Sequence, residues 1–267
     1  MIDALRVAPG SSPQIAMRDA RDDLGLENKA TAKRHLDDLR DRLSELQERL
    51  YAEGTRSVFV VLQGLDASGK DGVIRAVFTG VNPLGIRTAS FGVPTETELA
   101  HDYLWRIHAA PPPRGTIGVF NRSHYEDVVA VRLHALAPEE VWRRRPAHIR
   151  AWEEMLSDEG TAIVKVFLNV SREEQRARLQ ERIDDPGKRW KFRHDDLAVR
   201  ERFADWIGAW DDALTETSTD WAPWHVVPAD RNWLKALAVA ELLCATLERL
   251  DPELPEPEQG FEELRIE

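Results

Sequence analysis

The spacing of apolar residues changes several times along the chain, and this predicts alternating helices and strands. Between residues 31 and 51, leucines recur three or four positions apart with charged residues between them, which predicts an amphipathic helix packed on the domain. Short apolar runs predict strands at 58–62, 86–91, 116–120, 162–170 and 225–227. Further helical patterns cover 70–78, 95–108, part of 138–157, 197–215 and 233–250. Thr95-Glu96-Thr97-Glu98 is typical of a capping box at the start of a helix, and Ser171-x-x-Glu174 is a second one. Strands that alternate with helices imply an α/β fold with a mostly parallel sheet covered on both faces.

The regular pattern occupies the middle of the chain. Residues 1–28 contain a Pro- and Gly-rich stretch with scattered charges and are expected to form an irregular N-terminal arm. Residues 29–250 carry the alternating elements and are expected to form one domain. The acidic, proline-rich tail at 251–267 is expected to be extended.

Composition narrows the class of protein. With 267 residues, 42% of them apolar, the chain can bury a sizeable core, and its net charge of −11 argues against a general nucleic-acid binder. A single cysteine, Cys244, excludes an intramolecular disulfide and fits a reducing compartment. No apolar run approaches the ~20 residues of a membrane span, and the N-terminus lacks the apolar stretch of a signal peptide. We therefore expect a cytoplasmic protein with no membrane partner.

The most informative segment follows the first predicted strand. The apolar run 58–62 ends at Gly64, and Gly69 and Lys70 come five and six residues later, which matches the G-x-x-x-x-G-K pattern of a P-loop (Walker A). In such a loop the backbone N–H groups surround phosphates and the lysine reaches their charge. The helix expected from Lys70 onward would direct its N-terminal dipole at the same anion. The context of strand, loop and helix favours a phosphate site over a glycine-rich turn with an exposed lysine.

Two aspartates set this loop apart from the usual pattern. The position after the lysine is Asp71, where a nucleotide-binding loop carries Ser or Thr to place a hydroxyl on Mg²⁺. Asp71 could bind the metal or stabilise the first turn of the helix. Asp66 precedes the helix and is the better metal candidate of the two.

A second group of ionisable residues lies at the end of the strand predicted at 116–120. The strand continues directly into Asn, Arg, Ser, His, Tyr, Glu and Asp at 121–127. In parallel sheets, ligands bind at the carboxyl ends of the strands, so this segment is a candidate for catalysis. Arg122 could hold a phosphate with both arms of its guanidinium, Asp127 could share the metal ion, and Glu126 could face the acceptor. For His124, a structural and a catalytic role are equally open.

A basic insertion lies between two helical stretches. Residues 182–194 contain an Asp-Pro-Gly turn, five Lys or Arg residues and two aromatic residues, within an otherwise acidic chain. A solvated loop is the usual explanation of such a run. Phosphoryl transfer, however, needs cations that close over the site and exclude water, and a basic lid at about 182–196 would supply them.

Together these segments resemble the family-2 polyphosphate kinases. The resemblance runs from about residue 30 to residue 250. It rests on Gly64-Leu-Asp-Ala-Ser-Gly-Lys-Asp-Gly72, Phe120-Asn-Arg-Ser-His-Tyr-Glu-Asp127, Asp185-Pro-x-x-x-Trp-Lys-Phe192, Ser90-Phe-Gly-Val-Pro-Thr95, Tyr103-Leu-Trp-Arg106 and Trp221-Ala-Pro-Trp-His-Val-Val-Pro-Ala229. The resemblance implies a three-layer P-loop kinase fold similar to thymidylate kinases, with a mobile helical, basic lid. It also implies that aspartate after the lysine is a family trait.

The resemblance assigns roles to residues by motif position. The catalytic residues that it implies are Asp66, Lys70, Arg122, Asp127 and Arg182. The implied phosphate-binding residues are Gly64, Ala67, Ser68, Gly69, Lys70, Asp71, Gly72, Lys188, Arg189, Lys191 and Arg193. The implied nucleotide-binding residues are Phe91, Arg106, Asn121, Arg122 and Glu126. Asp66 and Asp127 would hold the metal ion, which is Mg²⁺ with Mn²⁺ as the second candidate.

Family members move the terminal phosphate of inorganic polyphosphate to a nucleotide, or back. They differ in accepting ADP, AMP or both, and Glu126 resembles the subgroup that accepts both. Adenine nucleotides are the expected acceptors, guanine nucleotides come second, and a dimer or tetramer is the expected assembly. One alternative is an ATP-dependent nucleoside monophosphate kinase, against which Asp71 counts. Two others are a GTP switch, which lacks its guanine-reading Asn-Lys-x-Asp segment here, and a scaffolding protein that kept the fold.

Overall fold

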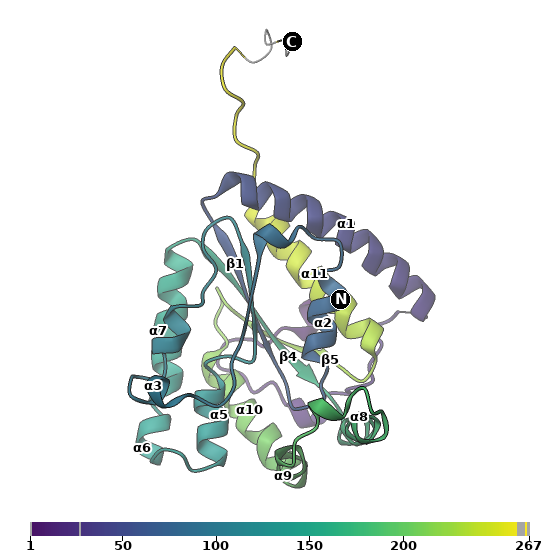
Figure 1. Ribbon diagram of the computed structural model, residues 1–267, viewed down its shortest axis with the longest axis vertical. Helices are drawn as coiled ribbons and strands as arrows, with labels where there is room; N and C mark the ends of the chain where they lie inside the picture. The colour runs from purple at the N-terminus through teal and green to yellow at the C-terminus, as the bar shows by residue number, and fades with distance from the viewer. Residues whose placement is uncertain (1, 27, 261–264, 266–267) are drawn as a thin grey trace.

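The computed structural model describes residues 2–26, 28–260 and 265, and its centre is a parallel β-sheet (Figure 1). Five strands in the described residues lie in the order β2-β3-β1-β4-β5, and every pairing between them is parallel. The strands are β1 (Ser57–Gln63), β2 (Ile86–Ser90), β3 (Ile117–Asn121), β4 (Thr161–Asn169) and β5 (Trp224–Pro228). The predicted α/β class is confirmed.

Helices cover both faces of this sheet and give the three layers expected of a P-loop kinase fold (Figure 1). One layer contains α1 (Lys29–Glu53), α2 (Lys70–Val77) and α11 (Asn232–Leu250), with α1 packed along α11. The other contains α5 (Glu126–Leu133), α7 (Arg145–Asp158) and α10 (Phe203–Thr217). The remaining helices are α3 (Glu96–Leu99), α4 (Trp105–His108), α6 (Glu139–Trp142), α8 (Arg172–Asp184) and α9 (Asp195–Glu201).

The register of the central strands brings the two predicted polar segments together. All seven residues of β1 are buried, as a central parallel strand requires. At the carboxyl ends, Leu62 of β1 pairs with Asn121 of β3. The loop after β1 and the segment after β3 therefore leave the sheet side by side, which explains why residues 60 positions apart can form one site.

Two predicted helices are shorter than the periodicity suggested. The helix expected over 95–108 is two four-residue helices, α3 and α4, because the Asp102 carboxylate accepts a hydrogen bond from Leu104 N–H at 2.9 Å and starts a new turn. The Thr95 capping box at the start is confirmed, with Oγ1 accepting from Glu98 N–H at 3.3 Å. The segment 197–215 is likewise divided: Arg202 lies between the end of α9 at Glu201 and the start of α10 at Phe203. Helix α5 was not predicted.

The second predicted capping box, at Ser171, is only half formed. Ser171 Oγ accepts from Glu174 N–H at 3.1 Å, as predicted. The Glu174 carboxylate, however, accepts from Arg178 Nε at 2.9 Å, and Ser171 N–H donates to Asp230 Oδ1 at 2.8 Å instead. The carboxylate of a neighbouring loop thus replaces the one within the helix.

The N-terminal arm packs against the edge of the sheet. It contains two short 3₁₀ helices, and Leu5, Val7 and Ile15 are buried in the same core as the sheet. Val7 N–H donates to Trp224 O at 2.8 Å, and Arg6 forms an isolated antiparallel bridge with His225. Residues 251–258 have no regular structure, and part of the predicted tail lies outside the described residues. Within the described part of the chain, no helix is long and apolar enough to cross a membrane.

Candidate active site

The loop predicted to bind phosphate joins the end of β1 to the start of α2. Gly64 and Gly69 have φ values of 148° and 98°, and a side chain at Gly69 would meet the Lys235 ammonium at 2.1 Å. Ala67 is also left-handed, with φ of 64°. Left-handed residues between right-handed ones curve the backbone into a concave turn with free N–H groups, which is the geometry of an anion site. The N-cap position of α2 has no side-chain cap, which leaves the first turn open to an anion.

Lys70 lies folded over this loop. Its ammonium donates to Gly64 O at 2.6 Å and to Leu65 O at 3.3 Å, and the residue is 8% exposed. Burial lowers the pKa of Lys70 to about 8, and the nearby charge of Arg122 acts in the same direction. An anion in the loop would oppose both effects. The lysine is thus a desolvated cation positioned at the loop, as the motif predicts.

The two aspartates of the loop face different partners. Asp66 forms an ion pair with Arg122, which follows β3 in a left-handed conformation with φ of 62°. The Asp71 carboxylate accepts from Asn121 Nδ2 at 2.7 Å and lies 3.5 Å from the Lys191 ammonium. The structure therefore brings Asp66, Asp71, Asn121 and Arg122 together. Asp71, although in the first turn of α2, binds across to β3 and to the basic insertion.

Glu126 lies at the start of α5, beside the loop. Burial raises the pKa of its carboxyl group, and the charges of Arg122 and Lys70 oppose this rise. The side-chain amide of Gln63 has one orientation in which both its nitrogen and its oxygen are hydrogen-bonded. In that orientation, Gln63 donates to Glu126 Oε1 at 3.1 Å and accepts from Ser123 Oγ at 2.9 Å. The last residue of β1 therefore fixes the position of Glu126.

Asp127 faces two arginines that come from other elements. Its carboxylate lies 3.6 Å from Arg106 Nη2 and 3.8 Å from Arg145 Nη1, and its backbone oxygen accepts from Arg145 at 2.6 Å. The guanidinium of Arg106 lies over the ring of Phe91, 5.6 Å from its centre, and that of Arg145 lies over Tyr103 at 4.5 Å. This side of the site thus offers cations and aromatic rings next to a buried carboxylate.

The structure only partly fits the predicted role of Asp66 and Asp127 as metal ligands. Each carboxylate has an arginine partner, and the described residues contain no group of three or more His, Cys, Asp or Glu side chains arranged to hold a metal. Mg²⁺ in phosphoryl-transfer sites needs only one or two carboxylates, because substrate phosphates and water supply the other oxygens. Asp66, on the loop itself, fits that requirement. The joint role of the two carboxylates stays a prediction.

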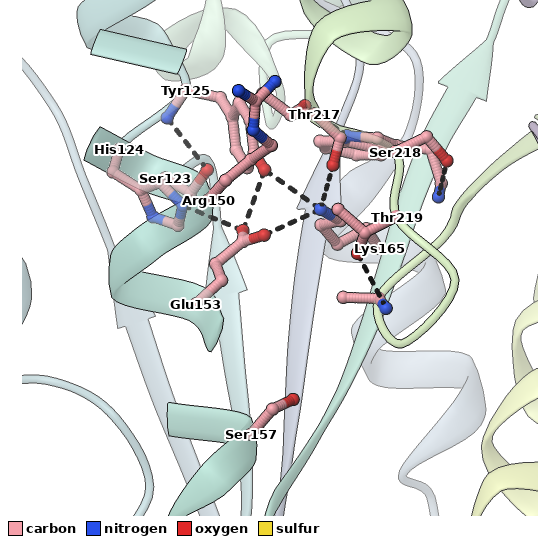
Figure 2. Close-up of polar contacts among 12 residues, drawn as sticks. Ser123, His124, Tyr125, Arg150, Glu153, Ser157, Lys165, Thr217, Ser218 and Thr219 are labelled. Carbon is pink, nitrogen blue, oxygen red and sulfur yellow. Dashed lines mark hydrogen bonds and ion pairs between the residues drawn. The ribbon is translucent and has the colours of Figure 1, made fainter. Parts of the chain in front are cut away.

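A buried polar network anchors the segment 121–127 from below (Figure 2). Glu153 of α7 accepts from Tyr125 Oη at 2.8 Å, lies 3.2 Å from His124 Nε2 and accepts from the Lys165 ammonium at 2.7 Å. All four side chains are fully buried. Burial lowers the pKa of His124, with the carboxylate of Glu153 opposing it. Because His124 is fully buried with its ring nitrogen against Glu153 of α7, the geometry supports the structural alternative for this residue.

One side chain of the basic insertion at 182–194 contacts the phosphate loop. Lys191 approaches Asp71, whereas Lys188 binds back to α8 through Glu181 at 2.5 Å, and Arg189 donates to Ile183 O at 2.8 Å. Arg182 donates to Asp196 Oδ2 at 3.4 Å. Arg193 N–H donates to the same Asp196 carboxylate at 3.3 Å. The insertion therefore lies beside the loop, with most of its charge directed to α8 and α9.

Sequence reasoning missed several residues that shape the site. They are Gln63, Arg145, Glu153, Lys165, Gln175, Arg178, Asp196 and Lys235. Two of them carry a signal that could have been used. Lys165 and Lys235 are single charges inside apolar segments, where an unpaired charge would be costly and a partner is expected.

Comparison with known proteins agrees with this geometry. A family model described as "Polyphosphate kinase 2 (PPK2)" matches residues 26–255. The chain belongs to the polyphosphate kinase 2 family. It is therefore an enzyme, a kinase that uses polyphosphate, and the resemblance noted in the sequence is confirmed. The ATP-dependent nucleoside monophosphate kinase considered above is not favoured.

Curated relatives and a solved structure from this family cover almost the whole chain. An AMP/ADP-polyphosphate phosphotransferase of Meiothermus ruber is 52% identical over 98% of both chains. An ADP-polyphosphate phosphotransferase of Rhodopseudomonas palustris is 45% identical over 81% of this chain and 79% of its own. The crystal structure of polyphosphate kinase 2 from Arthrobacter aurescens is similar with a TM-score of 0.92 and 41% identity, covering 96% of this chain and 92% of that one. The P-loop kinase fold is confirmed.

Proposed function

We propose that this polyphosphate kinase transfers the terminal phosphoryl group of inorganic polyphosphate to both AMP and ADP, and that the transfer is reversible. The observation that carries the proposal is the loop 64–72, with its left-handed glycines and buried Lys70, beside Glu126 and Arg122. The acceptor range is supported by the relative that is 52% identical and is named an AMP/ADP-polyphosphate phosphotransferase. Adenine nucleotides are the main acceptors in this proposal, and guanine nucleotides are secondary ones.

The donor end of the site is assigned to the loop. Lys70 contacts the transferred phosphoryl group, and the backbone N–H groups of the loop hold the phosphate next to it. Arg122 leaves Asp66 and neutralises charge on the same group. Residues 182–196 act as a lid in which Lys191 is already next to the loop, while Arg182, Lys188, Arg189 and Arg193 follow on closure. The lid excludes water, which would otherwise hydrolyse the chain.

The acceptor end is assigned to the segments after β2 and β3. Phe91 and Arg106 form a cation–π pair, and this pair offers a flat surface and a positive charge to a nucleotide. Asn121, which donates to Asp71 of the loop, and Glu126, near Arg122 and Lys70, orient the acceptor phosphate. Asp127 holds Arg106 and Arg145 in place.

Phosphoryl transfer in this family is assisted by a divalent metal ion, which we propose to be Mg²⁺, with Mn²⁺ as a substitute. Asp66 would hold it, together with substrate oxygens, and Asp127 is the second predicted carboxylate. When bound, the ion neutralises charge on the phosphates.

The transfer itself needs little acid–base chemistry. An oxygen of the AMP or ADP phosphate is already anionic, so it forms a bond to the terminal phosphorus of the chain without a general base. The bond between that phosphorus and the bridging oxygen breaks, and the shortened chain keeps the electron pair. Positioning and electrostatic stabilisation therefore account for the rate. One phosphoanhydride replaces another, which is why the direction follows the concentrations.

The organisation of the chain is part of the proposal. Residues 29–250 form the kinase domain, residues 1–28 are an N-terminal arm whose Leu5, Val7 and Ile15 pack on that domain, and residues 251–267 are an acidic tail. We expect a homodimer or homotetramer, with no nucleic-acid partner.

The proposal is tested with purified protein, Mg²⁺ and polyphosphate, with AMP or ADP supplied separately and the product nucleotides resolved by chromatography. The proposal predicts that ADP forms from AMP and that ATP forms from ADP. When polyphosphate and ATP are supplied instead, the reverse reaction should form ADP and lengthen the polyphosphate. If only one of the two nucleotides is phosphorylated, the proposed acceptor range is wrong. If neither is, the proposed function is wrong.

A further inference from the structure

The underside of the phosphate loop is held by side chains that no role above requires. Three consecutive loop carbonyls, those of Asp66, Ala67 and Ser68, all accept hydrogen bonds from α8 or α11. Gln175 Nε2 donates to Asp66 O at 3.2 Å, and Gln175 is fully buried. A run of three backbone acceptors bound from one side is a built arrangement, because a solvated loop would leave them to water.

Arg178 forms the centre of this arrangement. Its Nη1 donates to Ala67 O and to Ser68 O, both at 3.0 Å, and its Nη2 donates to Ala229 O at 2.7 Å and Asp230 O at 2.8 Å. One guanidinium thus joins the loop to the segment after β5. Only the planar fork of arginine can reach four carbonyls in this way.

Lys235 is a second cation beneath the loop. Its ammonium donates to Ser68 O at 2.7 Å, lies next to Gly69 and is 2% exposed. None of the ion pairs found among the described residues involves Lys235. Burial lowers the pKa of Lys235 to about 7, and Arg178 acts in the same direction. The carboxylates of Glu174 and Asp230 lie near enough to favour its charge without pairing with it, and the phosphate proposed for the loop would add to this effect.

Peptide geometry links this underside to the ligand side. In a planar trans peptide, the carbonyl of one residue and the N–H of the next point in opposite directions. Holding the carbonyls of Asp66 and Ser68 from below therefore directs the N–H groups of Ala67 and Gly69 to the open side of the loop. The Ser68 N–H instead closes the turn on Leu65 O at 3.0 Å.

We propose that Arg178 and Lys235 are positioning residues that preorganise the phosphate loop, and that their two charges beneath it raise its affinity for the phosphate chain. This inference rests on the proposed donor role of the loop. Gln175, Arg178 and Arg182 lie at spacings of three and four on α8, so one helix face supports the loop and leads into the lid.

The test compares Arg178→Met and Lys235→Met with Arg176→Met, an exposed arginine on the same helix. Binding of inorganic tripolyphosphate and of AMP, each with Mg²⁺, is measured by calorimetry on protein shown to be folded by circular dichroism. Both variants are expected to bind tripolyphosphate about tenfold or more weakly, as for loss of a charge-assisted hydrogen bond, with AMP affinity within about twofold of the wild type. Arg176→Met should match the wild type.

Arg178→Lys is the milder variant, and its tripolyphosphate affinity provides the test if Arg178→Met does not fold. It keeps the charge but loses the fork, so it should bind tripolyphosphate with intermediate affinity. Unchanged tripolyphosphate affinity in the folded variants, or an equal loss for both ligands, would overturn the inference. A wild-type protein that fails to bind tripolyphosphate would instead refute the donor role of the loop, so the two failures are distinguishable.

Discussion

Charged residues at this site bind one another across segments far apart in the sequence. Asp66 pairs with Arg122, and Asp71 lies between Asn121 and Lys191. In the proposed function, a phosphate chain and its metal ion would replace these pairs, because the chain would offer anionic oxygens to Arg122 and the ion would offer a cation to Asp66. At the scale of the residue, the site is a set of charges whose partners can be exchanged for substrate.

Lys70 gives the most direct prediction at this scale. Lys70→Ala removes the cation that we propose to contact the transferred group and should lower the rate of transfer by about 10²–10³-fold. The fold should be retained, which circular dichroism and the thermal midpoint check. Lys33→Ala, at an exposed position of α1, is the matched control and should keep full turnover. Near-normal turnover of Lys70→Ala would remove Lys70 from the mechanism.

His225 predicts how stability depends on pH. Burial lowers the pKa of His225 to about 4. Its ring nitrogen Nδ1 lies 3.2 Å from Lys165 O, and its backbone forms an antiparallel β-bridge with Arg6 of the N-terminal arm. The unfolded chain, with an ordinary pKa near 6.5, binds this proton more readily. The contribution of His225 is therefore full above pH ~6.5 and is lost as the pH falls toward 4, by up to about 3 kcal/mol.

Urea denaturation at several pH values measures this effect. His225→Gln should flatten the loss of stability between pH 6.5 and pH 4, whereas His148→Gln, at an exposed position of α7, should not. An unchanged pH dependence in His225→Gln would show that other groups cause the acid sensitivity.

At the scale of the element, the buried network fixes how β4, α7 and the segment after β3 fit together. Lys165 of β4 also donates to Thr217 O at 2.7 Å, so one ammonium joins a strand, a helix and the end of α10. Burial alone would raise the pKa of Glu153, but Lys165 and His124 hold it below its usual value. The carboxylate is therefore charged, and the pair is a buried salt bridge.

Breaking this pair should be more costly than removing it. Glu153→Leu or Lys165→Met alone leaves a buried charge without its partner and should lower the free energy of unfolding by about 3–5 kcal/mol. The double variant should recover a large part of that loss. Urea denaturation of the four proteins gives the coupling energy. Additive losses would contradict the account of the network.

The elements also show what the sequence could and could not predict. The sheet, the loop and the polar segment were predictable, because apolar runs, glycines and a capping box are local signals. The division of 95–108 was not, because it depends on the Asp102 side chain competing for the backbone. The partners of Asp127 were not either, since Arg106 and Arg145 reach it from α4 and α7 only in the folded chain.

At the scale of the whole molecule, the strand order places all parts of the site at one edge of the sheet. The loop follows β1, and the segments proposed to bind the acceptor follow β2 and β3. Arg178 and Lys235, which contact the loop, come from α8 and α11 after β4 and β5. All five strands run in parallel, so their carboxyl ends meet at that edge. In the proposed function, the donor and the acceptor therefore bind side by side at this edge.

The use of polyphosphate as the phosphoryl donor is tested most directly by comparing it with ATP. Purified protein with Mg²⁺ and AMP receives either polyphosphate or ATP as the donor at equal concentrations of terminal phosphate, and ADP formation is followed over time. We expect rapid ADP formation with polyphosphate, far slower formation with ATP, and loss of the polyphosphate reaction in Lys70→Ala. Efficient transfer from ATP with none from polyphosphate would contradict this expectation.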